Sequence, residues 1–89
     1  MNKTDETLFE FPCDFPIKAM GKIHEDFEQL VVNIIDRHVD DISTCKISTR
    51  NSKSNGYLAV TVIIRAHSKQ QLDAIYTDLT ATTEIIMAL

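Results

Sequence analysis

The segment from Tyr57 to Ala66 constrains the fold of this chain more than any other part of its sequence. Its residues alternate as in a β-strand, and both of the resulting faces are largely apolar. One face carries Leu58, Val60, Val62 and Ile64, and the other carries Ala59, Thr61 and Ile63. Because a strand that is apolar on both faces belongs inside a sheet, we predict that this segment forms a central strand.

Two segments show the three- and four-residue spacing of an amphipathic helix. We expect the first helix over residues 25–39, where His38 extends the apolar stripe and Arg37 lies with it in the last turn. The second helix is expected to start at Ser68, because Ser68 and Gln71 have the spacing of a capping box. The stripes consist of Phe27, Leu30, Val31, Ile34 and Ile35 in the first helix and of Leu72, Ile75, Tyr76 and Leu79 in the second.

Three other segments alternate as strands do. The first, residues 15–20, is expected to end at Gly21, and the last comprises residues 84–89. Between them, residues 43–51 are expected to form a half-buried strand. Its core side would carry Cys45, Ile47 and Thr49, and its outer side Lys46, Ser48 and Arg50. Asn55-Gly56 can supply the positive φ angles of a hairpin turn from this strand to the central one.

The element order β-α-β-β-α-β predicts a ferredoxin-like α+β sandwich. In this fold two helices cover one face of a four-stranded antiparallel sheet with strand order 4-1-3-2, and both crossovers are right-handed. Strand 57–66 then lies inside the sheet, in agreement with its two apolar faces. We expect residues 15–89 to form a single domain, preceded by an N-terminal arm over residues 1–14.

Charge, cysteines and hydropathy exclude several classes of function. Nine basic and thirteen acidic residues give a net charge of −4, which argues against nucleic-acid or membrane-surface binding through bulk charge. No segment resembles a signal peptide or a membrane span, so we expect a cytoplasmic protein. Cys13 and Cys45 belong to no metal or redox motif; we expect reduced thiols, with a Cys13–Cys45 disulfide as the alternative. No metal or cofactor is expected.

Two groups of residues resemble the YbeD-like family of small bacterial proteins of unknown function. The first is the pattern E-F-P-x-x-F-x-x-K-x-M-G from Glu10 to Gly21, and the second includes Val60-Thr61-Val62 and Ala66-His67. The resemblance covers about residues 8–89. It implies a fold similar to that of ACT regulatory domains, which bind small ligands such as amino acids and couple them to enzyme activity. It implies no catalytic residue, ligand or partner.

Charge is unevenly distributed along the chain. The segment from Ile42 to Leu72 contains five basic residues and no acidic one, so the rest of the chain is strongly acidic. On the expected strand phases, the sheet face away from the helices carries Lys18, Lys46, Ile63 and Arg65. This face could dock an acidic protein or a small anion; alternatively, its cations are solvated and discourage aggregation. RNA binding is disfavoured, because only Tyr57 offers an aromatic ring for base stacking.

The turn after the first strand is a second candidate site. Gly21, Lys22 and His24 lie where ACT-like folds hold ligands, and Gly21 could adopt a positive φ beside the free N–H groups of the helix start. Glu25 and Asp26 would repel an anion at that helix end, so a purely structural role for Gly21 is the alternative.

No cluster of residues indicates catalysis. The sequence has no nucleophile beside a base and no glycine-rich phosphate loop, and His24, His38 and His67 lack the spacing of metal ligands. The expected function is therefore a non-enzymatic regulatory or protein-interaction module with an unidentified protein partner. The alternative is a sensor of a small, amino-acid-like metabolite at the first strand-to-helix turn. A homodimer through a sheet edge or the open face also fits this fold.

Overall fold

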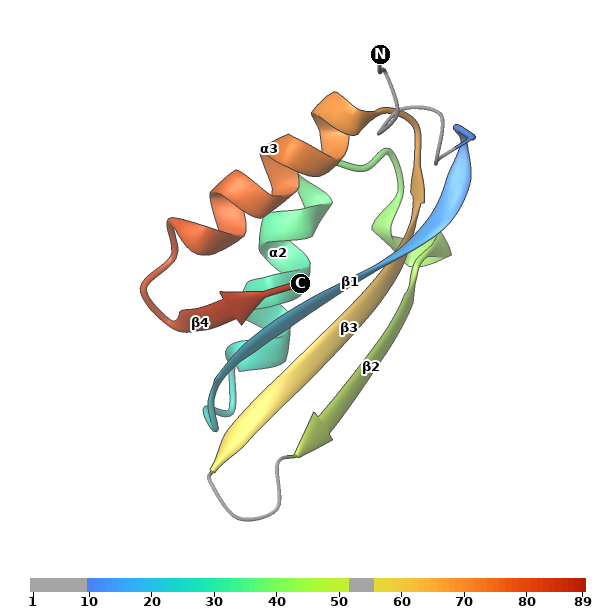
Figure 1. Ribbon diagram of the computed structural model, residues 1–89. Helices are drawn as coiled ribbons and strands as arrows, with labels where there is room; N and C mark the ends of the chain where they lie inside the picture. The colour runs from blue at the N-terminus through green and yellow to red at the C-terminus, as the bar shows by residue number, and fades with distance from the viewer. Residues whose placement is uncertain (1–9, 52–55) are drawn as a thin grey trace.

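The computed structural model describes residues 10–51 and 56–89, which form a four-stranded antiparallel sheet and two helices (Figure 1). The strands are β1 (Cys13–Lys22), β2 (Lys46–Asn51), β3 (Tyr57–Ala66) and β4 (Ile85–Ala88). The helices are α2 (Phe27–Asp36) and α3 (Lys69–Thr80), and a 3-10 turn, η1 (Ile42–Thr44), precedes β2. The strands lie in the order β2-β3-β1-β4, which is the predicted order read from the other edge, so the ferredoxin-like fold is confirmed.

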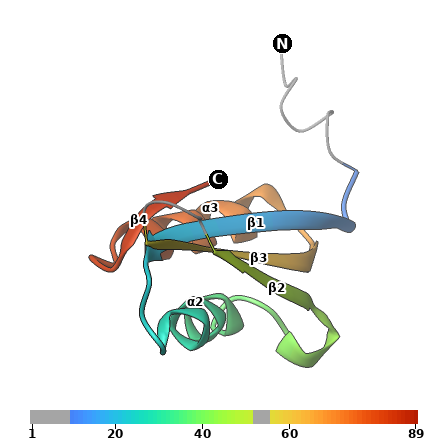
Figure 2. The same cartoon turned by 90° about the horizontal axis from the view of Figure 1, so that it is seen from below.

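β3 is the central strand that its two apolar faces predict. It pairs with β1 along its whole length and with β2 from Lys46↔Ile63 to Asn51↔Leu58. The side of β3 toward the helices is buried from Val60 onward, and the other side is half-buried up to Ile63 and exposed at Arg65. Figure 2 shows α2 below the strands. Within the described residues, β1 and β3 bury side chains on one face of the sheet and leave those of the other face exposed or half-buried.

The core lies between the sheet and the two helical stripes. α2 buries Phe27, Val31, Ile34 and Ile35, and α3 buries Leu72, Ile75 and Leu79. In the described parts of the chain no polar or charged residue is buried. The predicted stripes are therefore confirmed, and burial of apolar surface is the main force that holds the helices on the sheet.

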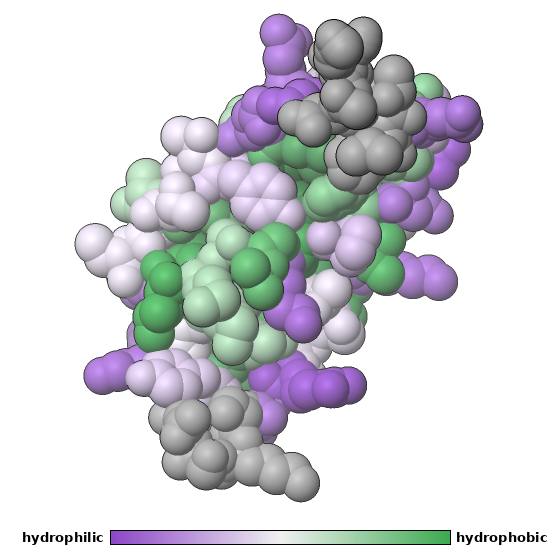
Figure 3. All heavy atoms as spheres, in the orientation of Figure 1, coloured by the Kyte–Doolittle hydropathy of each residue, from purple (hydrophilic) through white to green (hydrophobic). Residues whose placement is uncertain are grey.

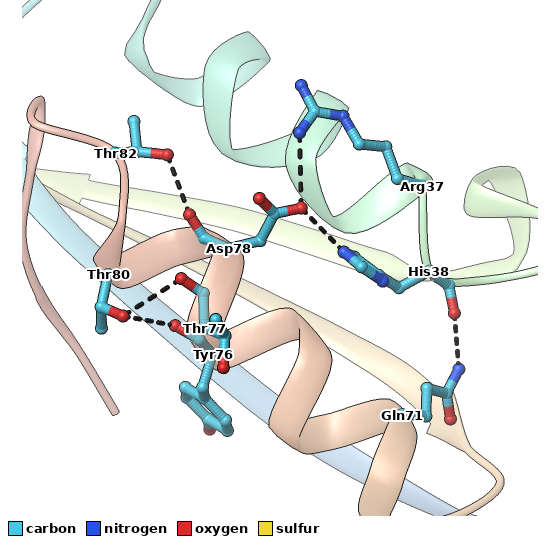
Figure 4. Close-up of polar contacts among 8 residues, drawn as sticks. All are labelled: Arg37, His38, Gln71, Tyr76, Thr77, Asp78, Thr80 and Thr82. Carbon is cyan, nitrogen blue, oxygen red and sulfur yellow. Dashed lines mark hydrogen bonds and ion pairs between the residues drawn. The ribbon is translucent and has the colours of Figure 1, made fainter.

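The first helix is shorter than predicted. α2 spans Phe27–Asp36 instead of residues 25–39, and the chain turns after Asp36. His38 therefore does not extend the apolar stripe. Its Nε2 lies 2.8 Å from Oδ2 of Asp78 on α3, and Arg37 donates to the same oxygen at 3.3 Å (Figure 4). Gln71 donates from Nε2 to the carbonyl oxygen of His38 at 2.8 Å. These contacts fasten the end of α2 to α3.

The capping prediction for the second helix is confirmed. The Ser68 hydroxyl accepts a hydrogen bond from the backbone N–H of Gln71 at 3.0 Å, and α3 starts at the next residue, Lys69. The Gln71 side chain accepts in turn from the backbone N–H of His67 at 2.7 Å. Two backbone donors at the start of α3 are satisfied in this way.

β2 is not the half-buried strand that its alternation predicts. All six of its residues are exposed, including Ile47 and Thr49, whose side chains were expected in the core. β2 is exposed because the helices pack mainly on β1, β3 and β4, and β2 lies at the edge of the sheet that they do not cover (Figure 1). The strand also starts later than predicted, since Asp41 caps η1 by accepting from the backbone N–H of Ser43 at 3.0 Å.

Gly21 does not end the first strand and is not the positive-φ turn residue that we predicted. It is buried within β1, opposite Leu58 and Ile85, where the pairing of β1 with β4 shifts register. Among the described glycines, only Gly56 has a positive φ, of 71°. A Cβ on Gly21 would lie 2.5 Å from Cε1 of Phe27 and against a backbone carbonyl oxygen, so glycine is required there for close packing.

Parts of two predictions lie outside the described residues, namely residues 1–9 of the N-terminal arm and Asn55 of the hairpin turn. The positive φ of Gly56 agrees with such a turn. The two cysteines are free, and Cys13 and Cys45 lie on opposite sides of β3. Neither α2 nor α3 has the length and apolar composition that crossing a membrane would need.

Candidate functional site

The sheet face turned away from the helices, here called the open face, is built from rows of side chains that cross three strands. Lys18 of β1 lies opposite Thr61 of β3, which lies opposite Ser48 of β2. The row on one side of it contains Met20, Ala59 and Arg50, and the row on the other side contains Pro16, Ile63 and Lys46. This register brings all four predicted face residues, Lys18, Lys46, Ile63 and Arg65, onto one surface.

One end of the open face is a shallow hollow of about 560 Å³ that brings Lys46, Ile63 and Arg65 together. Arg65 donates there to Oδ1 of Asp14 at 3.1 Å, so its charge already has a carboxylate partner. Both side chains are largely exposed, and an ion pair of this kind contributes little to stability. Arg65 is therefore a weaker candidate for partner binding than its position in the sequence suggested.

A second hollow, of about 290 Å³, lies in the middle of the open face. Its floor consists of the small side chains of Ala59 and Thr61, and Lys18 and Arg50 stand on either side. The hydroxyls of Ser48 and Thr61 add hydrogen-bonding groups to the two cations. An ammonium and a guanidinium with neighbouring hydroxyls can hold a carboxylate or a phosphate.

Arg50 was not predicted as a site residue, although its position in the sequence indicated that it lies on the open face. It follows Lys46 and Ser48 at the two-residue period of the strand, so it had to share their face. In the described residues, no ion pair engages Lys18, Lys46 or Arg50. These three residues are the cations at the two basic hollows of the open face that remain available to a partner.

The other end of the open face is apolar. Met20, Tyr57, Ile86 and Met87 line a hollow of about 270 Å³ there, and Ile86 and Met87 are about half exposed. Figure 3, in the orientation of Figure 1, shows green side chains gathered where β4 lies, with purple side chains beside them near the centre and at the margins. The open face therefore combines an apolar region with a basic region, an arrangement found at surfaces that bind other proteins.

The turn between β1 and α2 borders a separate pocket of about 410 Å³. Two of the predicted turn residues, Lys22 and His24, line this pocket, whereas Gly21 is buried in β1 and does not. The Nδ1 atom of His24 accepts from the backbone N–H of Asp26 at 3.1 Å, so this histidine helps to shape the entry to α2. The other lining residues are Ile23, Phe27, Leu30, Thr83, Glu84 and Ile86.

The remaining histidines and the cysteines show no chemical site. His38 is bonded to Asp78, and hydrogen bonds from His38 and Arg37 hold the pKa of that carboxyl below its usual range. Burial raises the pKa of the Cys45 thiol, which keeps it protonated and weakly nucleophilic. Within residues 10–51 and 56–89, no three His, Cys, Asp or Glu side chains are grouped as metal ligands.

Comparison with known proteins yields relatives whose activity is not described. The family described as "Protein of unknown function (DUF493)" matches residues 6–89. A UPF0250 protein of Paraburkholderia phytofirmans is 44% identical over 80 residues, which is 90% of each chain. A UPF0250 protein of Ralstonia nicotianae is 45% identical over 76 residues, covering 85% of this chain and 78% of the relative.

A solved structure with the same fold is the solution structure of protein HP0495 from H. pylori. It superposes with a TM-score of 0.74 at 10% sequence identity, covering 91% of this chain and 85% of that one. At this low identity the likeness bears on the fold alone. It agrees with the ferredoxin-like arrangement described above.

Proposed function

The chain belongs to the DUF493 family of proteins of unknown function, and the names of its UPF0250 relatives state no activity, so we propose a function from the geometry of the structure. The protein is a non-enzymatic interaction module that binds an acidic protein through its open face. It regulates that partner by covering the partner's acidic surface. Two free, half-buried cysteines suit the reducing cytoplasm, where we place this interaction.

The observation that carries this proposal is the set of three unpaired cations beside an apolar region. Lys18 and Arg50 flank a hollow floored by small side chains, and Lys46 lies in the next row. A partner with carboxylates beside apolar side chains would satisfy both regions at once. All acidic residues of this chain lie outside the segment from Ile42 to Leu72, which supplies Lys46 and Arg50 to the open face.

Copurification from the source cells, followed by binding with the purified partner, tests this proposal. We expect Lys18→Glu and Arg50→Glu each to weaken the complex at least about tenfold, because each places a carboxylate against an acidic surface. Lys69→Glu makes the same change of charge on α3 and should leave binding intact. Rising salt should weaken the wild-type complex. A complex that both open-face variants retain at wild-type affinity contradicts the proposal.

A second candidate function rests on the 410 Å³ pocket at the β1–α2 turn. Its floor includes Phe27 and Leu30, while Lys22 and Glu84 place opposite charges on its lining. A small zwitterion, such as an amino acid with an apolar side chain, would match this arrangement of charges. The protein would then act as a sensor whose ligand stabilises the folded state.

A thermal-shift screen with amino acids separates the two functions. A sensor gains thermal stability from its ligand, and the amide resonances of residues 20–25 move; Lys22→Gln should remove both effects, whereas Lys69→Gln should not. A docking module shows neither effect with any metabolite and binds its protein partner regardless. Unchanged melting temperatures and unchanged resonances across the screen dismiss the sensor.

A further inference from the structure

The two edges of the sheet are built differently. β4 is four residues long, and its pairing with β1 shifts register between Met20 and Gly21. Short strands and bulges are two ways in which proteins protect a sheet edge from further pairing. β2 is six residues long and pairs with β3 without any shift. The regular edge of this sheet is therefore the β2 edge.

The backbone of β2 is accessible along this edge. All six residues of the strand are exposed, and the helices pack mainly on the other three strands. In the parts of the chain that the structure describes, backbone hydrogen bonds to Lys46–Asn51 come only from the ladder with β3. Alternate residues of an antiparallel edge strand point their N–H and C=O groups outward. β2 thus offers a template for one more strand.

The charges of β2 favour an acidic strand over a second copy of this chain. Lys46 and Arg50 lie symmetrically about Ser48 on the open face. If two copies paired antiparallel about Ser48, each Lys46 would face Arg50 of the other copy, and like charges directly opposite are unfavourable. The same two cations would attract a strand that carries carboxylates four residues apart.

The other side of β2 restricts the partner further. Thr49 donates to Oε1 of Glu28 on α2 at 2.9 Å, so a carboxylate already stands on the helix side of the strand. Ile47 is exposed on that side. An added strand should therefore direct uncharged, apolar residues to the helix side and its carboxylates to the open face, in alternation.

We propose that β2 binds an extended acidic segment of the partner protein as a fifth strand beside the four-stranded sheet. This inference rests on the proposed function and specifies how the partner reaches the basic end of the open face. Backbone hydrogen bonds to β2 supply affinity, and the pairing of carboxylates with Lys46 and Arg50 fixes the register.

Titration of the isotope-labelled full chain with a synthetic peptide, Ac-Thr-Glu-Val-Thr-Val-Glu-Thr-amide, tests the mode of binding. We expect amide resonances of Lys46–Asn51 to shift most, and their hydrogen exchange to slow. Two N-methylated peptides, methylated on alternate sets of residues, each block one edge of the peptide backbone. One of them should bind at least about tenfold more weakly than the other, because only one edge pairs with β2.

The controls separate this inference from the proposed function. A peptide with Lys in place of both Glu residues should fail to bind, and Lys46→Gln/Arg50→Gln protein should lose most of its affinity for the parent peptide. Absence of shifts in β2, or equal binding of the two N-methylated peptides, overturns strand addition. The proposed function falls only if the natural partner ignores Lys18→Glu and Arg50→Glu, so the two failures are distinguishable.

Discussion

Gly21 is the residue on which the junction of β1, β4 and α2 depends. The space for its side chain is occupied by the ring of Phe27 and the carbonyl oxygen of Glu84. We expect Gly21→Ala to lower the free energy of unfolding by about 2–3 kcal/mol, because the extra methyl group overpacks a buried site that backbone partly encloses. Urea denaturation of the folded chain measures this difference.

Gly56→Ala is the matched control for this prediction. Gly56 has a φ of 71° and open space where a Cβ would be, so alanine there costs only the conformational strain, about 1 kcal/mol. If both substitutions cost the same, close packing is not the reason for glycine at position 21.

Asp78 gives the folded protein a pH dependence whose direction follows from its contacts. Hydrogen bonds from His38 and Arg37 lower its pKa in the folded state, so the resulting stability is present at neutral pH and is lost as the pH falls below about 4. Asp78→Asn should therefore destabilise the protein at pH 7 and have less effect near pH 3. Thermal unfolding of wild type and variant across this range measures the convergence.

Asp73→Asn controls for the removal of a carboxylate from the same helix. Asp73 accepts from the Lys69 ammonium at 3.1 Å in an exposed pair of residues four apart, which contributes little to stability. Its loss should leave the acid dependence of wild type in place. If the difference in thermal stability between Asp78→Asn and wild type does not shrink toward low pH, the acid dependence does not come from Asp78.

At the scale of elements, β2 and β3 have the same strand period but different surroundings. Removing one methylene from each tests this difference: Ile64→Val should cost about 1 kcal/mol, because Ile64 is 1% exposed, and Ile47→Val less than about 0.5 kcal/mol, because Ile47 is 37% exposed. Chemical denaturation of the two variants provides the comparison. Equal costs would show that β2 is covered in solution, which would contradict its place at the open edge.

The spacing of apolar residues along the sequence was sufficient to predict the strands, the helices and their order. Alternation in residues 57–66 placed β3 in the centre, and the helical stripes placed the core, because both depend on neighbours close in the chain. Coverage depends on where the helices cross the sheet, so the exposure of Ile47 did not follow from its period. The role of Gly21 was misjudged for the same reason, since the need for glycine there comes from Phe27 and Glu84, which lie in other parts of the chain.

The candidate site was predicted in part. Strand phase correctly placed Lys18, Lys46, Ile63 and Arg65 on one face, and it placed Arg50 on the same side of its strand, although Arg50 was not chosen as a site residue. Two aspects required the structure: the ion pair that engages Arg65 with Asp14, and the hollow over Ala59 and Thr61. Both depend on cross-strand register, which the alternation of a single strand does not determine.

For the whole molecule, the distribution of charge determines whether copies of the chain associate. The net charge is −4, yet both charged side chains of β2 on the open face, Lys46 and Arg50, are cations. Two copies therefore bring like charges together when their β2 strands pair antiparallel about Ser48. We therefore expect wild type to remain monomeric at micromolar concentration. Self-pairing is opposed by two specific contacts, those between Lys46 and Arg50 of the other copy.

Lys46→Glu should convert this repulsion into attraction. In the antiparallel pairing about Ser48, the carboxylate introduced at position 46 faces Arg50 of the second copy, and symmetry repeats the contact. Replacing two like-charge pairs by two opposite pairs should tighten self-association about tenfold or more. Sedimentation velocity from about 10 µM to about 1 mM, at low salt, measures the dimer. Lys69→Glu has the same net charge and should behave as wild type; if Lys46→Glu does so too, β2 is not an edge available for pairing.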